Sequence, residues 1–310
     1  MTQADPAVLD WPAVEVHIPT HNRPEFLALA IASVLAQDYP GALSIAVIFD
    51  RQEPDQSLVS DGPVPVRVLT NDRTPGLAGA RNSGILSSAT DMIAFLDDDD
   101  QWLPGKLRRQ VEHLRQHPEA PFSSTSIRVD FGDSHTPRYA GTSLVSHERL
   151  LESRMSMLHS STFLIRRDAL LGPIGLIDEN SPASQKEDWD ILLRASRSHP
   201  IVHLDEPLVA VRWGGTSMFA QAWESKLASA EWILAGHPDI TGSQVGYARL
   251  LGQIAFAQAA LGRRRIAVRT AAASVKCRWR EPRGYLALLA AAGVPSSAIM
   301  KQLHKRGRGI

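Results

Sequence analysis

Four consecutive aspartates, Asp97–Asp100, follow the apolar run MIAFL and precede Trp102. Adjacent carboxylates repel one another, and burial makes each of them harder to ionise. Oxygen ligands select a hard cation such as Mg²⁺ or Mn²⁺, and the ligand spacing of an EF-hand loop is missing. Most charge runs are solvated loops, which is the alternative here. Because this run directly follows an apolar stretch, we predict a divalent-cation site that also takes a phosphate-bearing substrate.

A second acidic group lies in SQKEDWDILLRAS, where Glu187, Asp188 and Asp190 begin an apolar helical pattern. Acidic residues are common in a first helical turn because they complement the helix dipole. A carboxylate that accepts a proton from a reacting hydroxyl is the other use of this group. The residues alone leave both uses open.

Composition limits the classes of protein. The chain has 310 residues, of which 44% are hydrophobic and 21% charged, as in ordinary globular proteins. The one cysteine, Cys277, excludes an intrachain disulfide and a zinc site of several thiolates. The sequence contains neither an apolar stretch of about 18 residues nor a secretory leader, so we expect a cytoplasmic protein.

Charge is divided unevenly along the chain, although the total is zero. From Lys226 onward there are 14 Lys/Arg and 3 Asp/Glu, a net charge of +11, so the first 225 residues carry −11. We therefore predict two domains, 1–225 and 226–310, with different partners. The second domain is rich in alanine and leucine, and this pattern predicts paired helices joined at LGRRR.

Strands alternate with helices up to about residue 110. Strands are expected at 14–18, 43–49, 64–69 and 92–96, because the runs are apolar and rich in β-branched residues. Helices are expected at 25–37, 76–88 and 103–116, with Pro24 in the first turn of the first. This order predicts an α/β fold with a mainly parallel sheet, whose ligands bind beyond the carboxyl ends of the strands.

The segments VEVHIPTHNRPEFLALAIASVLAQDYP, GLAGARNSGI and FLDDDDQWLPGKL, with Asp50 between the first two, resemble the family 2 glycosyltransferases, which have the Rossmann-like GT-A fold. The resemblance runs from about residue 14 to residue 213. It implies an inverting, single-displacement transfer of a sugar from a nucleoside diphosphate sugar to an acceptor hydroxyl, with Mn²⁺ or Mg²⁺. A sugar-phosphate nucleotidyltransferase and a non-catalytic nucleotide-sugar-binding protein are the alternatives.

The resemblance assigns donor roles residue by residue. Asp50 takes the place of the aspartate that binds the base, although Arg51 stands where the family often has a second acid. Aligned on the family's DxD motif, Asp99 and Asp97 are the metal ligands, while Asp98 and Asp100 belong to the donor side. The remaining positions matched to donor binding are Pro19, Thr20, Asn22, Arg23, Arg81 and Arg212.

The resemblance also assigns the acceptor side. Asp188 corresponds to the usual base, with Glu187 assisting. Many relatives have a histidine after the last strand, where this chain has Trp213, Gly214 and Gly215. Either another group such as His203 or His159 replaces it, or the metal is held mainly by Asp99, the diphosphate and water. Thr216 is a further diphosphate contact in a loop expected to close over the donor. The acceptor-side residues are His159, Ser160, Ser161, Thr162 and Trp189.

Three uses of the basic C-terminal helices compete. They pack on the catalytic domain or in a homodimer, hold an anionic acceptor, or rest peripherally on an anionic membrane. Nucleic-acid binding is disfavoured because the basic residues do not alternate with aromatic ones. The acceptor is expected to be a carbohydrate, a lipid-linked molecule or a small natural product.

Overall fold

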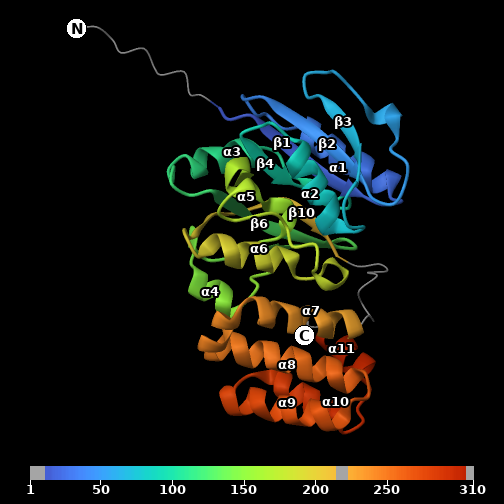
Figure 1. Cartoon of the computed structure of the whole chain (residues 1–310), viewed down its shortest axis with the longest axis vertical. Helices are drawn as coiled ribbons and strands as arrows, with labels where there is room; N and C mark the ends of the chain where they lie inside the picture. Colours follow the sequence, from blue (N-terminus) through green and yellow to red (C-terminus); the bar gives the residue numbers. More distant parts are fainter. Residues whose placement is uncertain (1–10, 214–222, 305–310) are drawn as a thin grey trace, which may run out of the picture. The chain divides into compact units, whose positions relative to one another are not determined.

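The computed structural model describes residues 11–213 and 223–304, and Figure 1 shows its helices and strands. The chain forms two compact units. The first is made of three segments, up to residue 145, 156–177 and 198–213. The second is made of 146–155, 178–197 and the described residues 223–304.

The centre of the first unit is a parallel sheet. Its strands β1 (Val14–Thr20), β2 (Leu43–Phe49), β3 (Val66–Thr70) and β4 (Met92–Phe95) lie in the order β3-β2-β1-β4 and pair in parallel throughout. All seven residues of β1 are buried, as its apolar run predicts for a strand covered on both faces. The predicted strands and the α/β fold class are confirmed.

Beyond β4 the sheet continues with strands that the sequence pattern did not predict. The exception is the last strand, before Trp213, which the family resemblance implied. The order is β4-β9-β6-β10-β5, in which β6 and β10 are parallel and the other pairs antiparallel. β7 pairs with β6 and β8 with β10. The bounds of these strands are β5 (Gln101–Trp102), β6 (Phe122–Phe131), β7 (Ser134–Arg138), β8 (Leu144–Val145), β9 (Leu164–Arg166) and β10 (Ile201–Arg212).

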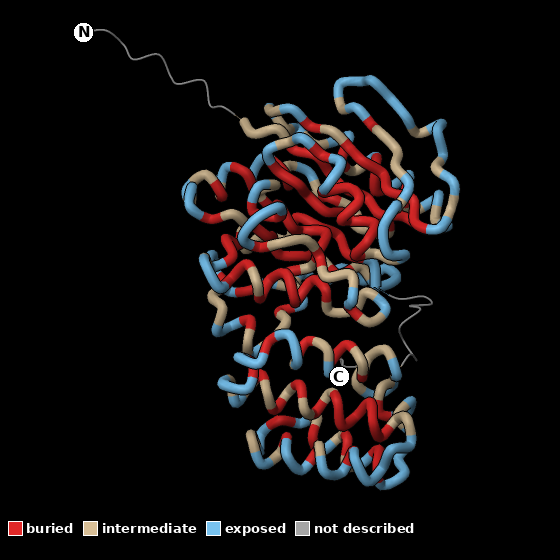
Figure 2. The backbone as a smooth tube through the Cα atoms, in the orientation of Figure 1, coloured by how far each residue is buried: buried red, intermediate tan, exposed pale blue. Residues whose placement is uncertain are grey.

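Helices α1 (Pro24–Leu35), α2 (Leu77–Ser87), α3 (Lys106–Leu114) and α5 (Arg167–Leu171) belong to the same unit. α1 begins with Pro24, as predicted, because the first N–H of a helix has no intrahelical partner to lose. The short 3₁₀ turns η1 (Gln56–Leu58) and η2 (Ser160–Thr162) complete it. Figure 2 shows that the strands form the buried centre, so the loops at their ends are fixed by a rigid core.

The second unit is helical. The predicted pair joined at LGRRR is α8 (Gln244–Ala260) and α9 (Arg264–Cys277), and Gly262 turns between them with a φ of +76°. No helix among the described residues is long and apolar enough to span a bilayer. The other elements are α4 (His147–Glu152), η3 (Pro182–Ser184), α6 (Glu187–Ser196), α7 (Trp223–Gly236), η4 (Pro238–Gly242), α10 (Pro282–Ala291) and α11 (Ser296–His304).

The compact units do not follow the chain in simple order. The segments 146–155 and 178–197 precede residue 225, yet they group with the C-terminal helices. The second of them includes α6, which carries the EDWD motif. The division into domains 1–225 and 226–310 stays a prediction.

Candidate active site

The four aspartates lie where β1 and β4 end. The two strands are parallel neighbours, so the loops after Thr20 and Phe95 meet at one edge of the sheet. Thr20 Oγ1 donates to Asp98 Oδ2 (2.8 Å). Arg23 Nη1 donates to Asp98 Oδ1 (3.1 Å) and to Asp99 Oδ2 (2.9 Å). The PTHNR segment therefore holds the middle two aspartates of the run, Asp98 and Asp99.

Arg81 supplies the second positive charge of this site. It is 1% exposed on α2, and its Nη2 donates to Asp97 Oδ1 (2.6 Å). Ser160 Oγ donates to the other carboxylate oxygen of Asp97 (3.0 Å). Burial alone would raise the pKa of Asp97, but Arg81 and His159 outweigh it and hold the pKa below its usual range. Asp97 is therefore ionised, and Arg81 forms a buried salt bridge with it.

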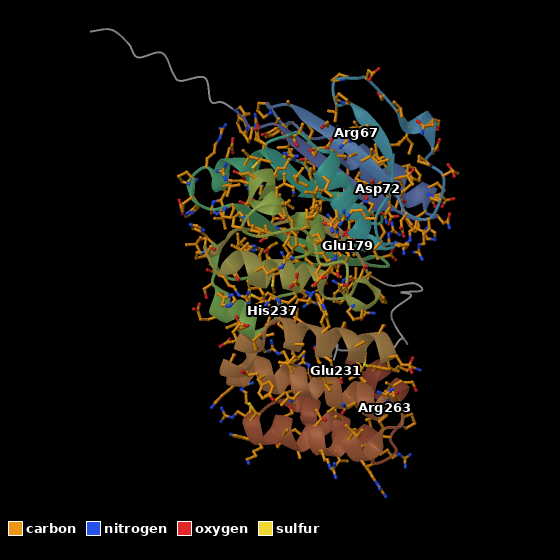
Figure 3. All side chains as sticks on the ribbon, in the orientation of Figure 1. Arg67, Asp72, Glu179, Glu231, His237 and Arg263 are labelled. Atoms are coloured by element: carbon orange, nitrogen blue, oxygen red, sulfur yellow. The ribbon has the colours of Figure 1, made fainter. Side chains whose placement is uncertain are left out.

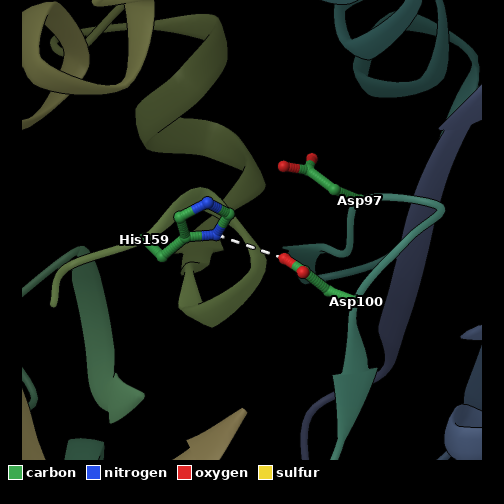
Figure 4. A group of neighbouring side chains, drawn as sticks. All are labelled: Asp97, Asp100 and His159. Carbon is green, nitrogen blue, oxygen red and sulfur yellow. Dashed lines mark ion pairs between the residues drawn. The ribbon is translucent and has the colours of Figure 1, made fainter. Parts of the chain in front are cut away.

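Asp100 is the most enclosed of the four aspartates, with 2% of its side chain exposed. Its Oδ2 accepts from Ser161 Oγ (2.6 Å), and its Oδ1 accepts from the backbone N–H of Arg212 (3.1 Å). His159 Nδ1 lies 3.3 Å from Oδ2 (Figure 4). Burial, followed by repulsion from Asp97 and Asp99, raises the pKa of Asp100 well above its usual range. An added positive charge near Asp100 would therefore be favourable.

Two ligand sets can be drawn from this cluster. Side-chain atoms of Asp97, Asp100 and His159 lie within 4.8 Å of one another (Figure 4). Accessibility favours a different pair, because the side chains of Asp99 and Asp97 are 36% and 20% exposed. Burial and repulsion from Asp97 and Asp98 raise the pKa of Asp99. Both sets fit a hard cation, and the assignment of Asp99 and Asp97 stays a prediction.

The structure distinguishes the two histidines considered as replacements for the family's histidine. His203 is fully buried, and its ring nitrogens bond Ser124 Oγ (2.8 Å) and Ser126 Oγ (3.1 Å) on β6. His159 is the histidine at the acidic cluster. The predicted loop residues Gly214, Gly215 and Thr216 lie outside the described residues.

Asp50 follows β2, and its carboxylate is held from two sides. Oδ1 accepts from Asn71 Nδ2 (2.8 Å) and the backbone N–H of Gly76 (3.1 Å), and Oδ2 accepts from Arg51 Nε (2.8 Å). Burial would raise the pKa of Asp50, but these donors lower it, so the carboxylate is ionised. Sequence reasoning missed Asn71, although it directly follows β3 at the strand edge where ligands were expected.

The other predicted donor residues have simple local roles. Pro19 is buried in β1, while Asn22 adopts a left-handed φ of +55° and its N–H donates to Gln52 Oε1 (2.6 Å). The Arg212 guanidinium lies 4.6 Å over the Phe26 ring. A role of Arg212 in diphosphate binding stays a prediction.

We predict that Ser161→Ala weakens this site. Ser161 is fully buried; its Oγ donates to Asp100 Oδ2 and accepts the backbone N–H of Asp97 (3.1 Å). Leaving a buried hydrogen-bonding group without its partner costs about 1–3 kcal/mol, which urea unfolding measures. The exposed Ser57→Ala is the control. A Ser161→Ala protein with unchanged stability and unchanged nucleotide affinity would contradict this role.

Asp188 begins α6 in the second unit and is 5% exposed. Arg154 Nε donates to its Oδ1 (3.1 Å), and Arg154 Nη2 forms an ion pair with its Oδ2. The backbone N–H of Trp189 also donates to Oδ1 (2.8 Å). These contacts stabilise the ionised carboxylate, the form that a proton acceptor needs. Arg154 was not predicted, because it lies 34 residues away and outside every motif.

The neighbours of Asp188 fix the start of α6. Trp189 is 5% exposed, and its indole N–H donates to the Leu150 carbonyl (2.9 Å). Asp190 accepts from His237 Nε2 (2.8 Å) and from Arg194 Nη2 (2.7 Å); Figure 3 labels His237. Trp189 and Asp190 therefore anchor the helix, while Glu187, also 5% exposed, precedes Asp188. The acceptor roles of Glu187 and Trp189 stay predictions.

Because of Lys186, the stability of the fold should change with pH in the alkaline range. Burial, with repulsion from Arg154, lowers its pKa to about 8 from the ordinary 10.5. Between these two values the unfolded chain keeps a proton that the folded chain has released, so raising the pH through this window stabilises the fold. We expect Lys186→Met to be more stable than the parent near pH 7, by a margin that shrinks toward pH 10.5. Melting temperatures across this range test it; a constant margin would contradict it.

Comparison with known proteins gives consistent matches. A family model described as glycosyl transferase family 2 matches residues 15–171, just over half of the chain. The Escherichia coli protein UDP-Glc:alpha-D-GlcNAc-diphosphoundecaprenol beta-1,3-glucosyltransferase WfgD is 22% identical over 224 residues, covering 72% of this chain and 85% of that protein. The Campylobacter jejuni GalNAc(5)-diNAcBac-PP-undecaprenol beta-1,3-glucosyltransferase is 34% identical over 110 residues, covering 34% and 35%.

Among solved structures, S. aureus TarS 1-349 in complex with UDP-GlcNAc is similar with a TM-score of 0.61. The alignment covers 96% of this chain and 92% of that chain at 15% identity. At this identity the likeness concerns the fold alone.

Proposed function

Because the chain belongs to glycosyl transferase family 2 and has the GT-A fold, we propose that it transfers a sugar from a nucleoside diphosphate sugar to an acceptor hydroxyl with inversion, assisted by Mn²⁺ or Mg²⁺. The observation that carries the proposal is the cluster of four aspartates with Arg23, Arg81 and His159 at the carboxyl edge of the sheet. The family match favours this activity over a nucleotidyltransferase or a non-catalytic binding protein.

We propose a UDP-sugar as the donor. TarS was solved with UDP-GlcNAc, and WfgD is named for UDP-Glc. Asp50, held by Asn71, accepts a hydrogen bond from the base. The residues that cradle the nucleoside and diphosphate are Pro19, Thr20, Asn22, Arg23, Arg81, Asp98, Asp100 and Arg212.

Asp99 and Asp97 would hold the cation, because theirs are the accessible carboxylates of the cluster. When bound, a divalent cation stabilises negative charge on the leaving diphosphate. Arg81 pairs with Asp97, and Arg23 pairs with Asp98 and Asp99. Their fixed charges also suit a diphosphate.

The transfer is a single displacement. The acceptor oxygen forms a bond to the anomeric carbon as the bond from that carbon to the diphosphate oxygen breaks, and the bonding electron pair leaves with the diphosphate. Asp188 takes the proton of the acceptor hydroxyl. This role comes from its place in the family's motif and is supported by the hydrogen bond from Arg154, which favours the ionised carboxylate. Glu187 assists in acceptor contact.

We propose a lipid-linked sugar diphosphate as the acceptor and a cytoplasmic location. Both curated relatives described above are named for undecaprenol-linked acceptors. The residues assigned to the acceptor side are His159, Ser161, Thr162 and Trp189.

Release of UDP tests the proposed function. The purified chain is incubated with UDP-Glc, UDP-GlcNAc or UDP-Gal, with a short-chain polyprenyl-diphosphate-linked GlcNAc, and with Mn²⁺, Mg²⁺ or EDTA. We expect acceptor-dependent UDP release with at least one donor, lost in EDTA, and a product with inverted anomeric configuration by NMR. Release unaffected by EDTA would contradict the metal requirement, and a retained configuration would contradict the single displacement.

A further inference from the structure

Helices α9 and α10 form a layer against α8 in the second unit. The faces that they bury are made of small residues, such as Ala267 and Ala271 on α9 and Ala287 on α10. A Cβ at Gly284 would lie 2.8 Å from Val275 Cγ2, so the two helices approach closely. The sides of α9 and α10 that are not packed are exposed to solvent (Figure 2).

These exposed sides, with the residues that join and follow the two helices, are called here the α9–α10 surface. Its α9 positions are three or four apart, so they lie on one helix face. Trp279, in the connection, is 66% exposed, more than any other large apolar side chain of residues 11–213 and 223–304. The surface is made of Arg265, Val268, Arg269, Ala272, Lys276, Trp279, Arg280, Tyr285, Leu289 and Val294.

The charged side chains of this surface are all positive. From Ile240 to the end of the chain the sequence contains a single acidic residue, Glu281. Glu281 is 1% exposed, and its Oε1 accepts from Arg283 Nη1 (2.8 Å). Among the described residues of this stretch, therefore, arginine and lysine charges reach solvent with no exposed carboxylate beside them.

Trp279 is held in its exposed position. The Tyr285 hydroxyl donates to the Trp279 carbonyl (2.7 Å), which ties the connection to α10. The Arg280 guanidinium lies 4.6 Å over the indole ring. An indole and a phenol beside arginines, with aliphatic side chains between them, is the combination found at the headgroup level of membranes.

We propose that the α9–α10 surface binds an anionic phospholipid bilayer, with Trp279 and Leu289 at the depth of the headgroups and Arg265, Arg269 and Lys276 against lipid phosphates. The charge complementarity decides the partner. A symmetric contact with a second copy would bring the same arginines together without carboxylates. Nucleic-acid stacking needs a row of aromatic side chains, and this surface has two. The inference does not depend on which sugar is transferred.

Co-sedimentation of the full chain with vesicles tests the proposal. We expect binding to vesicles of phosphatidylcholine with phosphatidylglycerol, none to phosphatidylcholine alone, and a loss of binding in high salt. Arg265→Gln/Arg269→Gln should weaken binding about tenfold or more, because each basic residue near the membrane contributes several-fold. Trp279→Ala should weaken binding without removing the preference for anionic lipid.

The matched control is Arg108→Gln/Arg109→Gln, which removes two arginines, 44% and 48% exposed, from α3. It should bind vesicles as the parent does. UDP release with a water-soluble acceptor should be the same for both double variants, which separates this surface from the active site.

Equal binding to both vesicle types, no vesicle binding, or unchanged binding of the Arg265→Gln/Arg269→Gln variant would overturn the proposal. Two further measurements test the alternative partners of the surface. Sedimentation velocity without lipid tests for a second copy of the chain, and titration with fluorescent RNA and DNA oligonucleotides tests for nucleic acid. Self-association lost in the double variant would assign the surface to a second copy. Oligonucleotide binding without vesicle binding would assign it to nucleic acid.

Discussion

Asp188→Asn should reduce turnover by roughly a hundredfold to ten-thousandfold while leaving UDP-sugar affinity within about twofold of the parent. A positioned general base contributes a factor of that size, and the amide that replaces it does not accept the proton. Arg154, in the same unit, pairs with this carboxylate. Single-turnover kinetics and isothermal titration with UDP measure the two quantities separately.

Two controls accompany this variant. Asn keeps the size of the side chain but weakens the ion pair with Arg154, so the melting temperature must show that the protein remains folded. Arg154→Gln keeps the carboxylate and removes its charged partner, and we expect it to retain more turnover than Asp188→Asn. Equal losses of turnover and of donor affinity in Asp188→Asn would place this aspartate in donor binding, contrary to the role as base.

Asp99→Asn should lower the affinity for Mn²⁺ and UDP together by more than about a hundredfold. Loss of an outer-shell partner of a metal ligand commonly costs 10–100-fold, so loss of a direct ligand should cost more. Asp99 is the most accessible of the four carboxylates, with 36% of its side chain exposed. Titration of UDP at fixed Mn²⁺, and in EDTA, gives the metal-dependent part of the affinity.

His159→Gln is the matched variant for the metal site. It removes a nitrogen ligand from the alternative set of Asp97, Asp100 and His159. If Asp99 and Asp97 hold the cation, His159→Gln should cost much less metal-dependent affinity than Asp99→Asn. The reverse order would assign the cation to the set that contains His159.

The central fold was readable because its strands are long apolar runs. β1, β2 and β4 are buried on both faces, so their sequences contain little that competes with the strand pattern. β6 was missed for the opposite reason. It contains Ser123–Ser126, four polar residues that resemble a loop in sequence yet are fully buried. Ser124 and Ser126 are stabilised there by His203, a residue 77–79 positions away.

In the site, contacts between motif residues were predictable from the sequence, and contacts from residues outside the motifs were not. Thr20, Arg23 and Arg81 were chosen with the aspartates from their motifs, and they do contact them. Asn71 and Arg154 contact Asp50 and Asp188 through folding of distant segments. Neither partner stands at a motif position, so spacing in the sequence could not identify it.

The pairing of a nucleoside diphosphate with a divalent cation is the central claim, and thermal unfolding tests it most directly. The melting temperature is measured with UDP, dTDP, GDP, CDP or ADP, each with Mn²⁺, Mg²⁺ or EDTA. A ligand at a hundredfold excess over its Kd stabilises the folded state by about 2.7 kcal/mol. We predict a rise for UDP with Mn²⁺ or Mg²⁺ that disappears in EDTA. No rise with any nucleotide, or a rise unchanged by EDTA, would contradict a metal–diphosphate site at Asp97–Asp100.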